Sequence, residues 1–256
     1  MKILKFKKIS KNKYKLFLDN NESITLYEDV IINNNLLLLK EVDNALLDDL
    51  MKQNNCVDAY NIALNYIAVR MRSIYEVKEY LVKKGISNTL LENTIKKLTK
   101  DGYLDDLKFA RAFVNDKLTI TNNGPIKIKK ELLKYKVEES VINEVISDID
   151  NDIVKEKLSR LVEKQVKIKK GSTNTLKIKL VNYFVNLGYD KDMVLKELSK
   201  YELKSDENKL KRDYDKIYIK YKDKYEGSKL TYFIAQKLYT KGYTSSDITT
   251  VIKERV

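Results

Sequence analysis

The sequence predicts a mostly α-helical protein, built of tandem three-helix repeats that form an elongated curved array, with a small β element at the N-terminus. Its 256 residues include one proline and seven glycines, which is too little punctuation for many short strands. Apolar residues recur with the 3.6-residue period of helices. Four segments also align with one another around a short turn. With 43% hydrophobic residues, the chain can fill several small cores.

The first 55 residues are expected to form the β element and a lead-in helix. Residues 2–9, 13–18 and 23–28 alternate between apolar and polar side chains, as half-buried strands do. Asn20 and Asn21 indicate a turn between the second and third strands. Helical spacing over residues 43–51 then indicates a short helix that leads into the repeats.

The repeats are recognised by their turns. One aligned column lies where a helix commonly closes with a left-handed residue, and its members, 51, 52 and 54 residues apart, are Gly85, Lys136, Gly188 and Gly242. Two positions later a new helix is expected to begin, and three of the four residues there are of the N-cap type: Ser87, Glu138, Asp190 and Thr244. Each turn therefore joins the end of one helix to the start of the next.

Both helices around each turn carry apolar residues four apart, the spacing of a buried helical stripe. Before the turns the pairs are Val77 and Leu81, Ile128 and Leu132, Leu180 and Phe184, and Ile234 and Leu238. After the turns they are Leu91 and Ile95, Ile142 and Ile146, Val194 and Leu198, and Ile248 and Ile252. A third helix is expected upstream in each repeat, over residues 56–71, 104–118, 151–166 and 206–222.

These elements predict four three-helix repeats, over residues 56–101, 102–150, 151–205 and 206–256. Units of this kind bury their faces mainly against their neighbours. The alternative is a single globule containing four unrelated helix pairs. The agreement of so many aligned columns favours the repeat.

A joint between two helices is expected within R-M-R-S-I-Y-E, residues 70–76. Ser73 followed three residues later by Glu76 is the pattern of a capping box, so one helix ends near Met71 and another begins at Ser73. Arg70 then lies in the last turn of the first helix, where a cation complements the helix dipole, and Arg72 lies in the link. Ser73 is expected to be structural, whereas structural and ligand-binding roles stay equally open for the two arginines.

The formal charge of +13 and the isoelectric point near 9.3 favour a polyanionic partner. Lysines gather in residues 127–136 and in residues 164–179, the latter without any acid. Lysine meets phosphate as a point charge, so binding should be largely independent of base sequence. The candidate contact residues are Arg70, Arg72, Lys127, Lys129, Lys130, Lys134, Lys164, Lys167, Lys169, Lys170, Lys177 and Lys179. The alternative is that these lysines only solvate helix faces.

Catalytic sites find little support. Asp105 and Asp106 follow a glycine at a helix start, where carboxylates cap free amides, and Asp213 and Asp215 lie two apart on a helix and do not converge. The chain has no histidine and no glycine-rich phosphate loop, so neither an enzyme activity nor a cofactor is expected. Cys56, the single cysteine, is expected to be inert.

A membrane span and a signal peptide are also not expected. The chain has no apolar run of about 18 residues, the length that a membrane helix needs. Its N-terminus alternates lysine with apolar residues. The expected location is therefore the cytoplasm.

Four stretches resemble the characteristic run of the bacterial RecX regulators. They are A-L-N-Y-I-A-V-R-M-R-S-I-Y-E-V at 63–77, L-V-K-K-G-I at 81–86, D-G-Y-L-D-D-L-K-F-A-R-A-F-V at 101–114 and G-P-I-K-I-K-K-E-L-L at 124–133. The resemblance is specific over about residues 59–150 and weaker over the strands and the last two repeats. One departure is Y-K-V at 135–137, where the family has K-G-I, which affects the expected geometry of that turn.

The resemblance implies a non-enzymatic modulator of the recombinase RecA, with a place in homologous recombination, DNA repair and the SOS response. The protein is expected to be a monomer. Members of the family bind RecA filaments on single-stranded DNA and limit filament growth, ATP hydrolysis and strand exchange; double-stranded DNA is a further expected partner. The lysine faces of the second and third repeats would contact DNA or the filament. Two alternatives stay open: a sequence-independent architectural or helix-turn-helix transcriptional protein, and an interaction scaffold without a nucleic-acid role.

Overall fold

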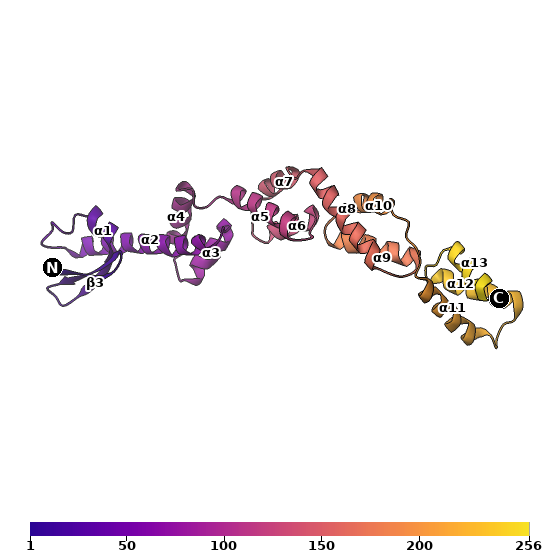
Figure 1. Cartoon of the computed structure of the whole chain (residues 1–256). Helices are drawn as coiled ribbons and strands as arrows, with labels where there is room; N and C mark the ends of the chain where they lie inside the picture. Colours follow the sequence, from indigo (N-terminus) through magenta and orange to yellow (C-terminus); the bar gives the residue numbers. More distant parts are fainter. Residues whose placement is uncertain (256) are drawn as a thin grey trace. The chain divides into compact units, whose positions relative to one another are not determined.

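A computed structural model describes residues 1–255 of the chain (Figure 1). Over these residues, three strands are followed by thirteen helices, so the predicted mostly α fold with an N-terminal β element is confirmed. The structure divides into two compact units, Met1–Arg111 with Lys134–Val141, and Ala112–Leu133 with the residues from Ile142 onward. The elongated, curved form of the array stays a prediction.

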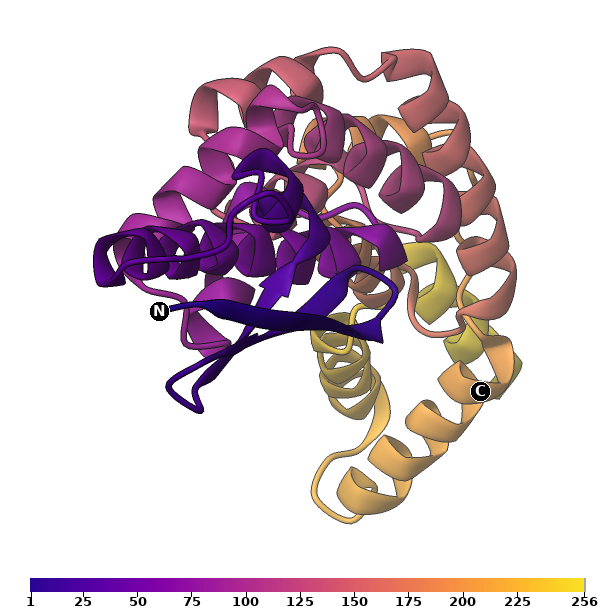
Figure 2. The same ribbon diagram turned by 90° about the vertical axis from the view of Figure 1, so that its left-hand side faces the viewer.

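The β element is a three-stranded antiparallel sheet of β1 (Ile3–Ser10), β2 (Lys13–Leu18) and β3 (Ser23–Tyr27), in the order β1-β2-β3. Leu16 pairs with Phe6 on one side and with Ile24 on the other, so apolar side chains share one face of the sheet. That face packs on α1 (Glu28–Asn33) and the N-terminal part of α2 (Asn44–Val69), as Figure 2 also shows. The predicted strands and the asparagine turn are confirmed, since Asn21 has φ 65°.

Helix α2 corrects one expectation. Separate helices at 43–51 and 56–71 were expected, but α2 runs without a break through the 26 residues from Asn44 to Val69, capped by the side chain of Asp43. Residues 52–55 are all polar, but their backbone continues the helix. Asp58 fixes the sheet to α2, because it accepts hydrogen bonds from Lys13 (3.1 Å) and from the Tyr27 hydroxyl (2.5 Å). The short helix α1 was not predicted.

Each repeat has three helices. The first combines the C-terminal half of α2 with α3 (Ile74–Lys83) and α4 (Asn88–Lys100). The second comprises α5 (Asp106–Ile120), α6 (Pro125–Leu133) and α7 (Glu139–Ser147). The third comprises α8 (Asn151–Ile168), α9 (Thr173–Asn186) and α10 (Lys191–Leu198). The fourth comprises α11 (Glu207–Tyr221), α12 (Gly227–Thr240) and α13 (Ser245–Arg255).

The predicted stripes fill the cores. All four pairs before the turns are buried, and so is the first member of each pair after the turns. The second member is buried at Ile95 and Leu198 but only half-buried at Ile146 and Ile252. In these two helices Val145 and Val251 are buried instead, since positions three and four residues apart share a helix face.

All four turn residues have positive φ, including the one that is not glycine: Gly85 (79°), Lys136 (54°), Gly188 (88°) and Gly242 (88°). The turn at Y-K-V therefore keeps the left-handed backbone conformation, with lysine in place of glycine. Glycine has a second role at two of these positions, because the start of a helix from the preceding repeat lies against it. A Cβ on Gly188 would lie 2.3 Å from the Lys127 nitrogen, and one on Gly242 would lie 2.5 Å from Thr175 Oγ1.

These close approaches belong to one docking interaction that occurs twice. The amide of Ile126, at the second position of α6, donates to the carbonyl of Gly188 (3.1 Å). In the same way the amide of Asn174, at the second position of α9, donates to the carbonyl of Gly242 (3.1 Å). The first amides of a helix have no partner inside it, and here the turn of the following repeat supplies the acceptor. Repeats two to four are thus joined by the same contact.

Candidate nucleic-acid interface

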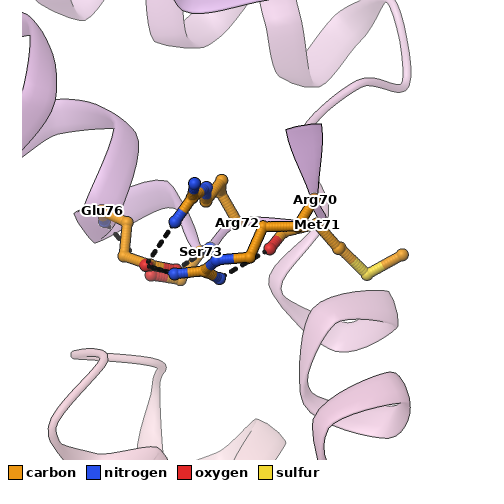
Figure 3. Close-up of polar contacts among 5 residues, drawn as sticks. All are labelled: Arg70, Met71, Arg72, Ser73 and Glu76. Atoms are coloured by element: carbon orange, nitrogen blue, oxygen red, sulfur yellow. Dashed lines mark hydrogen bonds and ion pairs between the residues drawn. The ribbon is translucent and has the colours of Figure 1, made fainter. Parts of the chain in front are cut away.

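The joint between α2 and α3 contains the predicted capping box (Figure 3). The Glu76 amide donates to Ser73 Oγ (3.2 Å), and the Ser73 amide donates to Glu76 Oε2 (3.2 Å). Ser73 is completely buried, so water could not take the place of its hydroxyl as the acceptor for the Glu76 amide. The structural role predicted for Ser73 is confirmed.

The two arginines of the joint lie in different environments. Both pair with the carboxylate of Glu76, and Arg70 also donates to the carbonyl of Met71 (2.9 Å) (Figure 3). The Arg72 guanidinium lies 4.1 Å above the ring of Tyr66, which stacks on Tyr80 with 3.9 Å between centroids. The side chain of Arg72 is 13% exposed, against 48% for Arg70. Packing therefore accounts for Arg72, and only Arg70 keeps a surface for a ligand.

The paired aspartates at the start of α5 act on backbone amides. Asp105 caps the helix by accepting from the Lys108 amide (3.0 Å), and that hydrogen bond holds the pKa of its carboxyl below the usual value. Asp106 accepts from the Ile74 amide (2.9 Å), and burial raises the pKa of its carboxyl. The predicted capping role is confirmed for Asp105. Asp106 instead ties the start of α5 to the start of α3.

The four candidate lysines of the second repeat divide by exposure. Lys127 is half-buried where α6 meets Gly188, and Lys129 donates to Asn143 (2.7 Å). Lys130 and Lys134 are exposed, lie four residues apart at the end of α6, and form no ion pair within the described part of the chain. These two lysines are the ones that the structure leaves available for a polyanion.

The third repeat brings three candidate lysines together. Lys167, Lys169 and Lys170, at the end of α8, line a hollow of about 350 Å³ together with Lys204 from the segment before α11. Glu202 and Asp206 also line it, so the hollow is basic but not purely so. We call it the third-repeat hollow. The hollow therefore brings candidate lysines at the end of α8 next to a lysine from the segment before α11.

Contacts differ among the six lysines of this run. Lys167 pairs with Glu163 (2.6 Å), and the ammonium of Lys169 lies 4.2 Å above the ring of Tyr183. The other four, exposed and without an ion pair within residues 1–255, are Lys164, Lys170, Lys177 and Lys179. Lys204 was not predicted, because it lies in an irregular segment whose sequence has no helical period.

A buried lysine was also missed. The ammonium of Lys157, on α8, donates to the carbonyls of Leu118 (2.6 Å) and Asn123 (3.2 Å) at the end of α5. Burial lowers the pKa of Lys157, and the nearby charge of Arg160 adds to that effect. A cation at the C-terminal end of a helix is favourable for the dipole, so Lys157 fastens the second repeat to the third.

Within residues 1–255, no helix combines the length and apolar character that a membrane crossing needs. The same residues contain no group of three histidine, cysteine, aspartate or glutamate side chains that could hold a metal ion. Asp213 and Asp215 point to different partners, as expected: Asp213 pairs with Lys241 (3.0 Å) and Asp215 with Arg255 (2.8 Å).

Comparison with known proteins identifies the two best-defined repeats. Residues 59–98 match the model of the first three-helix domain of RecX, and residues 105–146 match that of the second. A protein of Streptococcus uberis named "Regulatory protein RecX" is 29% identical over 259 residues, covering 98% of this chain and 99% of the relative. The chain is thus similar to RecX proteins over nearly its whole length. Another RecX relative, from Halalkalibacterium halodurans, is 28% identical over 250 residues, or 94% of each chain.

The fold is shared as well. A solved structure titled "Crystal structure of regulatory protein RecX" aligns with a TM-score of 0.64 and 21% identity, over 75% of this chain and 96% of that one. The arginine joint lies within the first RecX domain, and Lys130 and Lys134 lie within the second. The third-repeat hollow lies outside both domain models.

Proposed function

We propose that this protein is a regulator of RecA that binds RecA filaments on DNA and limits filament growth, ATP hydrolysis and strand exchange. The observation that carries the proposal is the similarity over nearly the whole chain to proteins named "Regulatory protein RecX". A match over all four repeats and the sheet supports a common role better than a match to one domain would. The proposed regulator acts by binding and not by catalysis.

The distribution of free lysines supports the DNA part of the proposal. Lys130 and Lys134 in the second repeat, and Lys170, Lys177 and Lys179 in the third, are exposed. Each phosphate that a lysine neutralises releases counterions, which favours binding at low salt. Repeats in tandem offer several such contacts at once, so individually weak contacts add through effective concentration.

The direct test is a titration of the purified protein into RecA on single-stranded DNA. DNA-dependent ATP hydrolysis and strand exchange should both fall as the protein is added. If both stay unchanged at saturating concentration, the proposal fails. Tight binding to duplex DNA without any effect on RecA would instead favour the architectural alternative, and protection of particular duplex sequences would favour the transcriptional one.

A charge-reversal pair tests the lysine surface. Lys130→Glu with Lys134→Glu changes two exposed residues at the end of α6, whereas Lys96→Glu with Lys100→Glu makes the same change at the end of α4. The salt dependence of binding to single-stranded DNA should become shallower by about 0.7 for each phosphate that no longer has a lysine partner, and only in the first pair. Equal behaviour of the two pairs would remove the second repeat from the DNA surface.

A further inference from the structure

The fourth repeat carries an aromatic cluster at the edge of its core. The rings of Tyr221, at the end of α11, and of Tyr225 and Phe233 contact one another, with centroids 4.5 Å apart for Tyr221 and Phe233 and 5.0 Å apart for Tyr225 and Phe233. All three are half-buried. The buried core of the repeat is formed by other residues of these helices, such as Ile217 and Ile234, and Tyr221 packs against it. The cluster therefore has a packed base and an exposed edge.

Helix α12 also carries two exposed tyrosines. Tyr232 is 72% exposed and Tyr239 is 64% exposed. They lie seven residues apart, which places them on one face of the helix about 10 Å apart along its axis. The buried stripe of α12, Ile234 and Leu238, lies on another face. Packing within the repeat does not explain why large aromatic rings occupy both positions.

Lysines surround the aromatic rings. The ammonium groups of Lys220, Lys229 and Lys237 lie 5.5, 5.6 and 5.1 Å from the rings of Tyr221, Tyr225 and Phe233 respectively. Residues 216–239 contain six lysines against two acids, Asp223 and Glu226. None of the six forms an ion pair within the described residues, so their charge is available to a ligand. The lysines are Lys216, Lys220, Lys222, Lys224, Lys229 and Lys237.

A ligand that matches this surface must present flat rings and negative charge together. Single-stranded nucleic acid does so, because its bases are free to stack on aromatic side chains while its phosphates meet lysines. A duplex hides its base faces and matches the lysines alone. An anionic membrane also attracts lysine and tyrosine, but an interfacial helix needs a free apolar face, and that of α12 is already buried in the repeat.

We propose that Tyr221, Tyr225, Tyr232, Phe233 and Tyr239, here called the aromatic patch, form with their lysines a stacking site for single-stranded nucleic acid. The site is independent of base sequence, because every base has a face that can stack. This inference rests on the DNA part of the proposed function and deepens it. It moves a principal DNA contact from the lysine runs of repeats two and three to the fourth repeat.

The test measures binding of the full-length protein to a fluorescent oligothymidylate by anisotropy, without RecA. Tyr232→Ala with Tyr239→Ala removes two exposed rings without touching the core. Each stack that is removed should weaken binding by roughly 5- to 150-fold, with the salt dependence unchanged because no charge is removed. Tyr232→Phe with Tyr239→Phe keeps the rings and should bind like the wild type. Tyr103→Ala, at a 54% exposed tyrosine of the segment before α5, is the matched control and should have no effect.

Removing lysine charge, instead of aromatic rings, should change the salt dependence of binding. Lys229→Gln with Lys237→Gln should reduce the slope of log affinity against log salt by about 0.7 for each phosphate that is no longer neutralised. Wild-type affinity in the double alanine variant would overturn the inference. So would loss of binding to phosphatidylglycerol vesicles, with oligonucleotide binding retained, because the patch would then be a lipid surface.

The proposed function and this inference can fail separately. If the double alanine variant loses oligonucleotide affinity while the wild type leaves RecA activity unchanged, the stacking site stands and the proposed function fails. If the wild type inhibits RecA and the variant binds oligothymidylate normally, the proposed function stands and the stacking site fails.

Discussion

Replacing Gly188 by alanine tests whether the docking between repeats contributes to stability beyond the turn itself. Gly85 is the matched control, because it occupies the same column with a similar φ, 79° against 88°, and a Cβ added there meets nothing within 4 Å. At Gly188 the added Cβ would lie 2.3 Å from the Lys127 nitrogen. The two substitutions therefore share the cost of a left-handed alanine and differ in the clash.

The geometry gives the size of the difference. An ordinary van der Waals contact of 3.4 Å requires α6 to move away by about 1 Å. That movement lengthens both hydrogen bonds of the docking interaction, Gly124 amide to Leu187 carbonyl (2.7 Å) and Ile126 amide to Gly188 carbonyl (3.1 Å), beyond bonding distance. A left-handed alanine costs about 1 kcal/mol, and each broken hydrogen bond costs about 1 kcal/mol more. We expect about 3 kcal/mol for Gly188→Ala and about 1 kcal/mol for Gly85→Ala.

Urea unfolding followed by circular dichroism measures how much unfolding free energy each substitution removes. Amide hydrogen exchange shows which helices lose stability. Repeat arrays need not unfold in one step, so exchange is the more specific readout. In Gly188→Ala, the first amides of α6 should lose protection while those of α3 keep it. Equal destabilisation by the two substitutions, or unchanged exchange at α6, would refute the docking interpretation.

Three further outcomes follow from buried polar contacts. Ser73→Ala should destabilise the protein by about 1 kcal/mol in urea unfolding, whereas Ser87→Ala, at an N-cap whose side chain makes no hydrogen bond, should have almost no effect; equal losses would contradict the capping role. Lys157→Met should cost about 1–3 kcal/mol, because two carbonyls lose their donor, and an unchanged midpoint would show that water replaces it. For Asp213, burial raises the pKa of the carboxyl, but hydrogen bonds from Lys241 and Tyr243 outweigh that effect and leave the pKa below 3.8. A carboxyl with a lowered folded pKa adds stability above 3.8 that is lost as pH falls through its folded value. Tyr243→Phe should therefore destabilise the protein at neutral pH, by about 1.5–3 kcal/mol, and the difference should narrow below pH 3.8 in acid titration of the urea midpoint; a constant difference would count against this coupling.

The repeated helices were predictable from the sequence because each depends on local signals. An apolar pair four residues apart, such as Val77 and Leu81, predicts a buried helix face. Ser73 and Glu76, three residues apart, predict the start of a helix. Lys136 was placed in its turn by alignment alone, although lysine itself gives no sign of a left-handed conformation. Periodicity across four copies thus supplied information that one copy lacked.

Contacts between distant residues were not predictable. Lys157 looks like any exposed helical lysine, and only the packing of α5 against α8 makes it a buried donor. Lys204 approaches Lys170 because an irregular segment returns to the end of α8. Counting charge along the chain also treated Arg70 and Arg72 alike, whereas the ring of Tyr66 distinguishes them. Such differences arise from tertiary geometry, which a single sequence does not encode in its spacing.

The uninterrupted helix α2 fixes the orientation of the sheet relative to the first repeat around the helix axis. Its N-terminal half packs in the core of the sheet through Leu50, and its C-terminal half packs in the core of the first repeat through Ala63. One residue inserted between Asp58 and Tyr60 would turn the sheet by about 100° around the helix axis, whereas seven would restore its direction to within about 20° and displace it by about 10 Å. The number of residues in α2 thus sets both the orientation of the sheet around the helix axis and its distance from the first repeat.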